Sequence, residues 1–294
     1  MFSWFYDGYI RVMSFLGGYR PEVLVAKNDK RPTLPMDLPA TNYGSRYRGA
    51  GVFTGLLGIA IVFTAIAPSA FALTTDWALQ VFGVVKVLMM LIMLIIVRRI
   101  GGANGLKQDW INSRLASERK RYSDLEKAIL ELRGGLNTAC TEKVKVKLRS
   151  VLNGAESQIH YNSNRANQYE AIEKTTAVLG IIIFYVALFA ACGLLVSEFH
   201  IIPHQTWLIL FTAFFPAALG GLHGINGFLT IGSLAMDHRK MQKFLIDALK
   251  NLESSNASEP DTVLKIADEV VAGLNSRDHE WKEKTNEGIN LSLA

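Results

Sequence analysis

The stretch that decides the fold is residues 78–97, ALQVFGVVKVLMMLIMLIIV. It holds one charge, Lys86, and about 20 apolar residues suffice for a helix to cross the hydrocarbon core of a bilayer. Three further stretches, 49–75, 175–197 and 199–236, contain no Asp, Glu, Lys or Arg. Because 50% of the 294 residues are hydrophobic and 19% are charged, a disordered chain is excluded. We therefore expect an all-α integral membrane protein with four transmembrane helices, at residues 50–73, 78–97, 177–197 and 206–234.

The basic residues predict the orientation of these helices. Apart from Lys86, every Lys and Arg lies in 1–48, 98–174 or 236–294, and the two short connectors between paired helices hold none. Loops rich in Lys and Arg stay in the cytoplasm. Both termini and the middle segment are therefore predicted to be cytoplasmic, and their basic residues to contact anionic lipid headgroups rather than nucleic acid.

Five segments follow from this layout. The polar ones are predicted to be helical, with helices at 106–133, at 236–252 and at 260–286, and with one helix running from about residue 141 to residue 197. The predicted domains are a cytoplasmic aromatic N-terminal segment with a Pro-rich linker (1–48), a first transmembrane hairpin (49–97), a long cytoplasmic helical hairpin (98–174), a second transmembrane hairpin (175–235) and a cytoplasmic helical tail (236–294).

The N-terminal segment has two parts. Residues 1–16 are rich in Phe, Trp and Tyr. Such a stretch suits the bilayer interface or a partner's groove, or a short helix packed on the protein's own cytoplasmic domain, and these interpretations stay open. Residues 21–40 carry four prolines and are predicted to form an extended linker.

Lys86 is the sharpest single candidate for function. A lysine at the middle of a membrane helix costs about 2.5–3.5 kcal/mol on insertion scales, and no acidic residue lies in any predicted span. One hypothesis is a water-filled path that Lys86 lines, which in a symmetric oligomer becomes a positive ring favouring anions. The alternative is a lysine that extends to the interface or is neutral between helices.

The fourth apolar stretch contains a second group of candidates. Pro216 can kink its helix, and His223 and Asn226 lie one turn apart, which suggests a gate with polar groups facing a cavity. Small residues four apart let helices approach closely, so simple packing is the alternative. The helix-packing candidates are Gly51 and Gly55 in the first span and Gly220 and Gly224 in the fourth.

A third group lies in the polar segments. Trp110, Arg114 and Glu118 are spaced by four residues and so share one helical face, and Trp281 is a lone aromatic among charges. This face is either a receiver or docking surface or a salt-bridged packing surface. Phosphate-binding glycine loops, HExxH, GxSxG and paired metal-binding cysteines are absent from the sequence, so we expect no enzyme, no metal and no cofactor.

Two runs of sequence resemble a known family. YGSRYR at 43–48, ahead of the spans, and DWINSRLASER at 109–119 are similar to the SLATT proteins, the SMODS and SLOG-associating two-transmembrane effectors of bacterial conflict systems. Their helix after the spans typically carries a Trp, an Arg and then Ala-x-Glu-x-x-Arg, matched here by Trp110, Arg114, Ala116, Glu118 and Arg121. The resemblance covers about residues 40–290, including Pro216–Ile225 and the tail around Asp278 and Trp281.

The resemblance implies a membrane-disrupting or pore-forming effector in the bacterial inner membrane, used in antiviral defence against phage and switched on by a nucleotide signal or a cytoplasmic sensor protein. Only about 48 residues precede the spans, so the trigger is expected to reach the cytoplasmic helices directly or through that protein. A homo-oligomer is expected, because one four-helix subunit encloses little space. The alternative is a non-conducting membrane scaffold that recruits a soluble partner through the cytoplasmic helices.

Overall fold

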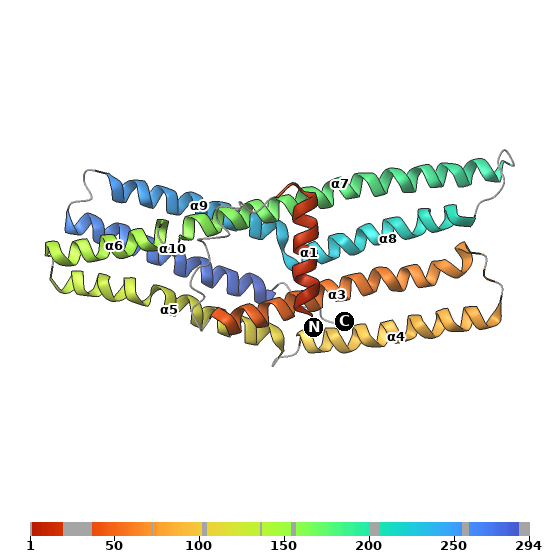
Figure 1. Ribbon diagram of the computed structural model, residues 1–294, viewed down its shortest axis with the longest axis horizontal. Coiled ribbons are helices and arrows are strands. Elements are labelled where there is room, and N and C mark those ends of the chain that lie inside the picture. The colour runs from red at the N-terminus through yellow and green to blue at the C-terminus, as the bar shows by residue number, and fades with distance from the viewer. Residues whose placement is uncertain are drawn as a thin grey trace. The chain divides into compact units, whose positions relative to one another are not determined.

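Every regular element in the described part of the chain is an α-helix, as predicted. The computed structural model describes residues 2–19, 37–71, 73, 75–101, 105–135, 137–153, 157–199, 206–254 and 259–287. The helices are α1 (Ser3–Leu16), α3 (Asp37–Ala70), α4 (Asp76–Gly101), α5 (Leu106–Gly134), α6 (Thr138–Asn153), α7 (Gln158–Glu198), α8 (Thr206–Leu229), α9 (Ile231–Glu253) and α10 (Pro260–Glu287) (Figure 1).

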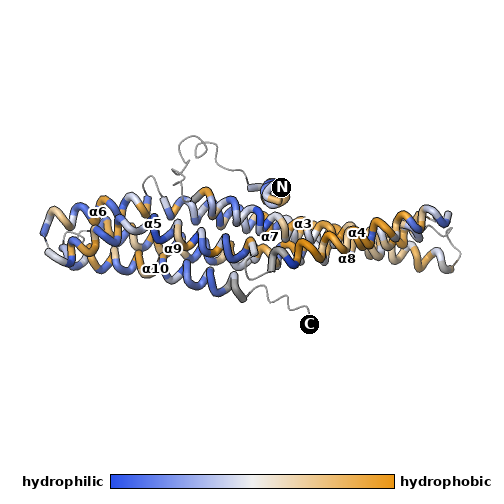
Figure 2. Tube along the Cα trace, turned by 90° about the horizontal axis from the view of Figure 1, so that it is seen from below, coloured by the Kyte–Doolittle hydropathy of each residue, from blue (hydrophilic) through white to orange (hydrophobic). Residues whose placement is uncertain are grey.

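Four helices are long and apolar enough to cross a membrane, which confirms the predicted number within the described residues. The apolar windows lie in α3, α4, α7 and α8. Figure 2 shows the same contrast, with hydrophobic residues dominating these helices and mixed residues along α5, α6, α9 and α10. The fold is therefore compatible with a multi-pass membrane protein.

The chain divides into two compact units. The apolar unit comprises the described residues of 1–18, 45–106 and 171–231, and the polar bundle comprises those of 19–44, 107–170 and 232–294. Since α3 and α7 are long, each contributes residues to both units. The N-terminal helix α1 belongs to the apolar unit rather than to the polar bundle.

Small residues occupy several buried positions of the apolar unit, and many of its large apolar residues are exposed. Its buried positions include Ala50, Ala67 and Ala190, whereas Leu88 and Phe189 are exposed. In water the exposed apolar side chains would be unfavourable, but in a bilayer they would contact lipid, which is as apolar as leucine. The small buried residues let the helices approach one another closely. The exposed apolar faces of α4 and α7 are therefore suited to lipid.

The polar bundle has an ordinary soluble-protein core. Leucine, valine and isoleucine side chains on one stripe of each of its helices meet in the interior. Its largest fully buried members from α5, α6, α9 and α10 include Leu125, Leu132, Leu148, Leu152, Leu245, Leu252 and Leu274.

Three predicted boundaries are wrong. The continuous helix expected from residue 141 to residue 197 is broken, because α6 ends at Asn153 and α7 begins at Gln158. The Ser157 hydroxyl accepts a hydrogen bond from the backbone N–H of His160 at 3.2 Å, a standard N-cap that starts a new helix.

The other two errors concern a start and an end. Residues 37–40 of the expected linker form the first turn of α3. A proline such as Pro39 is tolerated there, because the backbone N–H groups of a first turn have no partner within the helix. Residues 21–36 of that linker lie outside the described residues. The fourth apolar helix ends at Leu229, not near residue 234. Thr230 adopts φ 53°, a left-handed conformation that ends α8 before α9 begins at Ile231.

Candidate functional site

Lys86 is a half-buried cation on α4, a helix that exposes many large apolar side chains. It lies midway along α4, between Val85 and Val87, which are 37% and 53% exposed. In the described part of the chain it forms no salt bridge and no hydrogen bond. An ammonium group within an apolar helix is costly to bury without a partner, so Lys86 is the first candidate for function in the apolar unit.

Asn226 is a structural junction in the apolar unit. Its side-chain amide donates a hydrogen bond to the Thr176 hydroxyl at 2.6 Å, and its carbonyl oxygen accepts one from the Tyr9 hydroxyl at 2.5 Å. It thereby ties α8 to both α7 and α1. Because both ends of the amide are engaged, Asn226 joins helices rather than presenting a free polar group.

Asn226 does not form a cluster with the other gate candidates. His223 is exposed, and its Nδ1 lies 3.0 Å from the Leu219 carbonyl oxygen of its own helix. Pro216 is also exposed, and α8 continues through it without interruption. No described hydrogen bond joins either residue to Lys86.

Two of the four candidate packing glycines lie at the contact between α3 and α8. A Cβ at Gly51 would stand 1.9 Å from the Phe228 ring, and one at Gly55 would stand 2.3 Å from Ile225. A Cβ at Gly220 or Gly224, in contrast, would have no described atom within 4 Å. The close contact on α8 is made by Gly221, against Ile59, because it lies on the side of the helix that faces α3.

The structure brings the receiver candidates together inside the polar bundle. The rings of Trp110 and Trp281 meet edge to face, with centroids 5.0 Å apart. The Arg114 guanidinium carbon lies 3.9 Å from the centre of the Trp281 ring, within the range of a cation–π interaction. The first part of α3 packs against Trp110, since a Cβ at Gly44 would stand 2.6 Å from the Trp110 indole nitrogen.

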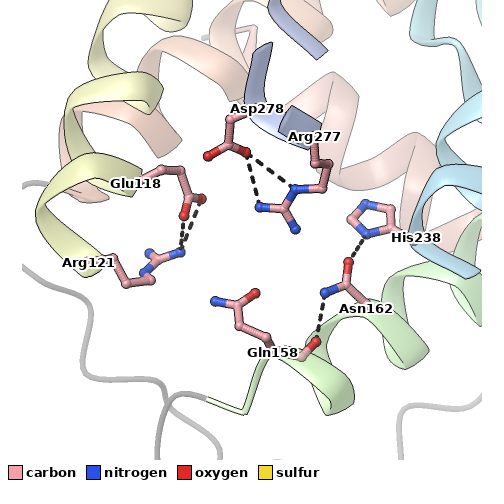
Figure 3. Close-up of polar contacts among 7 residues, drawn as sticks. All are labelled: Glu118, Arg121, Gln158, Asn162, His238, Arg277 and Asp278. Carbon is pink, nitrogen blue, oxygen red and sulfur yellow. Dashed lines mark hydrogen bonds and ion pairs between the residues drawn. The ribbon is translucent and has the colours of Figure 1, made fainter. Parts of the chain in front are cut away.

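Glu118 lies in a buried ionic cluster beside these tryptophans. Its two carboxylate oxygens accept hydrogen bonds from Arg121 at 3.1 and 2.9 Å (Figure 3). Burial raises the pKa of Glu118, but Arg121, Arg114 and Arg277 together lower it by more, so the pKa lies below its ordinary value. The carboxylate is therefore ionised at neutral pH.

Arg277 and Asp278 bring the charge of α10 into the same cluster. Two nitrogens of Arg277 donate to the Asp278 carboxylate at 3.1 and 3.3 Å. Burial lowers the pKa of Arg277, but Tyr122, Asp278 and Glu118 raise it by more, so it stays charged; burial raises the pKa of Asp278 above its ordinary value. Three guanidinium groups thus face two carboxyl groups.

A buried polar chain next to this cluster was not predicted from the sequence. His238 and Asn162 are 9% and 0% exposed, and their Nδ1 and Oδ1 atoms lie 2.7 Å apart. The Asn162 amide nitrogen donates to the Gln158 backbone carbonyl at 2.7 Å, so its oxygen is the acceptor and His238 Nδ1 carries the proton (Figure 3). Gln158 is 1% exposed, and its Nε2 has no partner among the described residues.

A signal for His238 was present in the sequence. It lies three residues after Ala235 and three before Met241, on the apolar stripe of α9. A histidine on such a stripe needs a buried partner. Its partner Asn162, however, is 76 residues away, and no local pattern indicates that pairing.

Neither site has the composition of a metal centre. No group of three or more His, Cys, Asp or Glu side chains that could hold a metal ion occurs in the part of the chain that the structure describes. The apolar unit offers the half-buried Lys86 within an apolar helix, and the polar bundle offers a cationic, aromatic-walled cluster beside a buried amide, Gln158 Nε2, that has no partner among the described residues. No family model, no curated protein and no solved structure matches this chain.

Proposed function

We propose that this protein is a homo-oligomeric membrane effector that conducts ions through a path lined by Lys86. The single observation that carries the proposal is the half-buried position of Lys86 on α4 with no acidic partner in the described residues. A cation in hydrocarbon is expensive, and intramembrane ionisable groups mostly serve transport. A ring of such lysines would favour anions.

The packing within the apolar unit supports a path between copies of the chain. The α3–α8 contact is filled at Gly55 and Gly221, so it leaves no room for water there. On α4, in contrast, the side of the helix that carries Lys86 also exposes apolar side chains, namely Leu79 and Met90, which lie within about 40° of Lys86 at 3.6 residues per turn. That face is free to meet the same face of another copy, which would bring several Lys86 side chains together.

The polar bundle would act as the receiver. Its ionic cluster holds one more guanidinium than carboxyl group, and beside it lie two tryptophan rings and Gln158 Nε2, which has no partner among the described residues. These groups suit an anionic trigger, such as a nucleotide signal or an acidic segment of a sensor protein. Together with the resemblance to SLATT proteins, they support a role in antiphage defence, with the protein in the bacterial inner membrane and its bundle and termini in the cytoplasm.

Anion flux across vesicles tests the proposal. We expect the purified chain, reconstituted in liposomes, to dissipate a chloride gradient, with Lys86→Met abolishing the anion preference and Lys86→Arg, which keeps the charge, retaining it. Equal flux and selectivity in both variants would remove Lys86 from the mechanism. No flux from any variant, with a soluble protein retained by the bundle, would instead indicate the non-conducting scaffold.

The native cysteine Cys140 tests the orientation separately. It is partly exposed at the start of α6, in the polar bundle. If the bundle is cytoplasmic, a membrane-impermeant maleimide should label Cys140 only after spheroplasts are permeabilised. Labelling in intact spheroplasts would reverse the proposed topology.

A further inference from the structure

The helix α1 lies across the helices of the apolar unit instead of running along them (Figure 1). It touches three of them. Phe5 packs on Phe53 of α3 with ring centroids 4.8 Å apart, and Tyr9 bonds Asn226 of α8. At its other end, the Met13 carbonyl accepts a hydrogen bond from Thr175 of α7 at 2.7 Å.

Backbone contacts fix both ends of α1. A Cβ at Gly49 of α3 would stand 1.7 Å from the Phe2 carbonyl oxygen, and one at Gly17 would stand 2.1 Å from the Ala171 carbonyl oxygen of α7. Only glycine fits at such separations. The placement of α1 is therefore built into the packing of the apolar unit.

The residues that α1 touches mark the edge of the apolar stretches. Arg48, which donates to the Tyr6 hydroxyl at 2.7 Å, is the last charge before the uncharged stretch 49–75. Thr175 is the first residue after Lys174, where the uncharged stretch 175–197 begins. If these stretches fill the hydrocarbon core, α1 lies at the level of the lipid headgroups.

The helical wheel of α1 shows which side faces the bilayer. At 3.6 residues per turn, Val12 and Leu16 lie within about 20° of Phe5, whereas Asp7 and Ser14 lie on the opposite flank. Phe5 contacts Phe53, which is five residues, or about 7.5 Å, further into the apolar stretch than Arg48. The flank carrying Val12 and Leu16 therefore points toward the hydrocarbon, and the flank carrying Asp7 points away from it.

The outer face of α1 is strongly apolar and uncovered. Trp4 is 73% exposed and Phe15 67%, and both project between the two flanks, away from the helices that α1 crosses. Val12 and Leu16 are 56% and 60% exposed. Tryptophan and phenylalanine at headgroup depth are typical of helices that lie in the membrane interface.

We infer that α1 is an interfacial helix that inserts its Trp4, Val12, Phe15 and Leu16 side chains into the headgroup and acyl boundary of the bilayer that the four apolar helices cross. The lipid of this same bilayer is the occupant, because α1 packs on three of the apolar helices at the level where their uncharged stretches begin, and its exposed apolar side chains point away from those helices. Asp7 and Arg11 cancel in charge, so insertion is driven by apolar burial and does not require anionic lipid.

Spin-label accessibility in vesicles tests this inference, which rests on the membrane insertion assumed in the proposed function. In a background with Cys140→Ser and Cys192→Ser, the labels are placed by Phe15→Cys and, as a second site, by Val12→Cys. Asp7→Cys on the opposite flank is the matched control, and Leu88→Cys on the exposed face of α4 reports insertion of the spans. Full-length protein is reconstituted in phosphatidylcholine, with and without phosphatidylglycerol.

We expect labels at 12 and 15 to lose collisions with a water-soluble nickel complex and gain collisions with oxygen, while the label at 7 keeps an aqueous collision rate, in both lipid compositions. Equal nickel access at 7, 12 and 15 would overturn the inference while leaving shielding at 88, and thus the proposed function, intact. Shielding at 15 with spin–spin broadening that disappears on dilution with unlabelled chain would also overturn it, since a second copy would then cover α1. Nickel access at 88 would overturn both proposals.

Discussion

The ionic cluster of the polar bundle makes a quantitative prediction for Glu118→Gln. The substitution keeps the shape of the side chain and removes one of two negative charges that face Arg114, Arg121 and Arg277. The Glu118 and Arg121 side chains are only 14% and 12% exposed, so water cannot readily replace the lost carboxylate.

Breaking a buried ion pair from one side costs about 3–5 kcal/mol, because an uncompensated charge stays behind. Since both side chains retain some exposure, we expect the lower end of this range, about 3 kcal/mol. Hydrogen exchange from globally opened bundle amides should then become faster by about two powers of ten. Glu118→Gln with Arg121→Gln should recover part of the loss, with a coupling energy of about 0.5–3 kcal/mol.

The assay is hydrogen exchange with mass spectrometry on the full chain in detergent, following peptides of α5 and α10, with α8 peptides as an internal reference. Asp268→Asn is the matched control. Asp268 also pairs α10 with α5, through two 2.8 Å contacts to Arg133, but these side chains are 39% and 52% exposed. An exposed pair contributes about 0–1 kcal/mol, so this control should change exchange little.

The same variant carries a pH signature. The pKa of Glu118 is lower in the folded state than its ordinary 4.5, so its stabilisation is present above that pH and is lost as the pH falls toward the folded pKa. Glu118→Gln should abolish this part of the acid sensitivity. The raised pKa of Asp278 changes stability with pH in the opposite direction. Because the native chain and the Glu118→Gln variant both contain Asp278, its effect cancels to first order when the two are compared. If Glu118→Gln accelerated exchange no more than Asp268→Asn, the cluster would not be a buried ionic site.

Three further substitutions test the packing of the apolar unit and its boundary. Gly221→Ala would place a Cβ 2.4 Å from Ile59 and should lower the free energy of unfolding by about 1–3 kcal/mol. Gly220→Ala meets open space and should stabilise α8 by up to about 1 kcal/mol. Thermal unfolding in detergent compares the two variants, and equal melting temperatures would contradict the packing of α8 on α3. Asn226→Leu removes the hydrogen bonds to α1 and α7 and should lower the stability of this contact by about 1–3 kcal/mol. The loss should appear as faster hydrogen exchange confined to α1 and the residues it contacts. Unchanged protection of α1 would mean that Asn226 does not hold α1 in place. Thr230→Gly should relieve a left-handed threonine and raise stability by about 1–2 kcal/mol, so a lower melting temperature would contradict the assigned conformation.

Local properties of the sequence were enough to predict the helices. The scarcity of charge over a membrane thickness identifies α3, α4, α7 and α8, with Lys86 as the single charge within the stretch in α4, because each residue contributes to insertion independently of distant ones. The predicted helix at 106–133 agrees closely with α5, which ends at Gly134, since helix termination depends on nearby residues. The shared face of Trp110, Arg114 and Glu118 follows from helical periodicity alone.

Only the tertiary structure decided which of these faces meet. The partners Trp110 and Trp281, or Asn162 and His238, are far apart in the chain and belong to helices whose apolar stripes would tolerate several pairings. Likewise, the aromatic N-terminal segment allowed several environments, and its packing on the apolar unit depended on close approaches at Gly49 and Gly17 that no spacing in the sequence indicates. Hydropathy and periodicity are properties of single segments, whereas a buried contact requires that two segments fit and compensate each other's charge, and that condition is met only in the assembled fold.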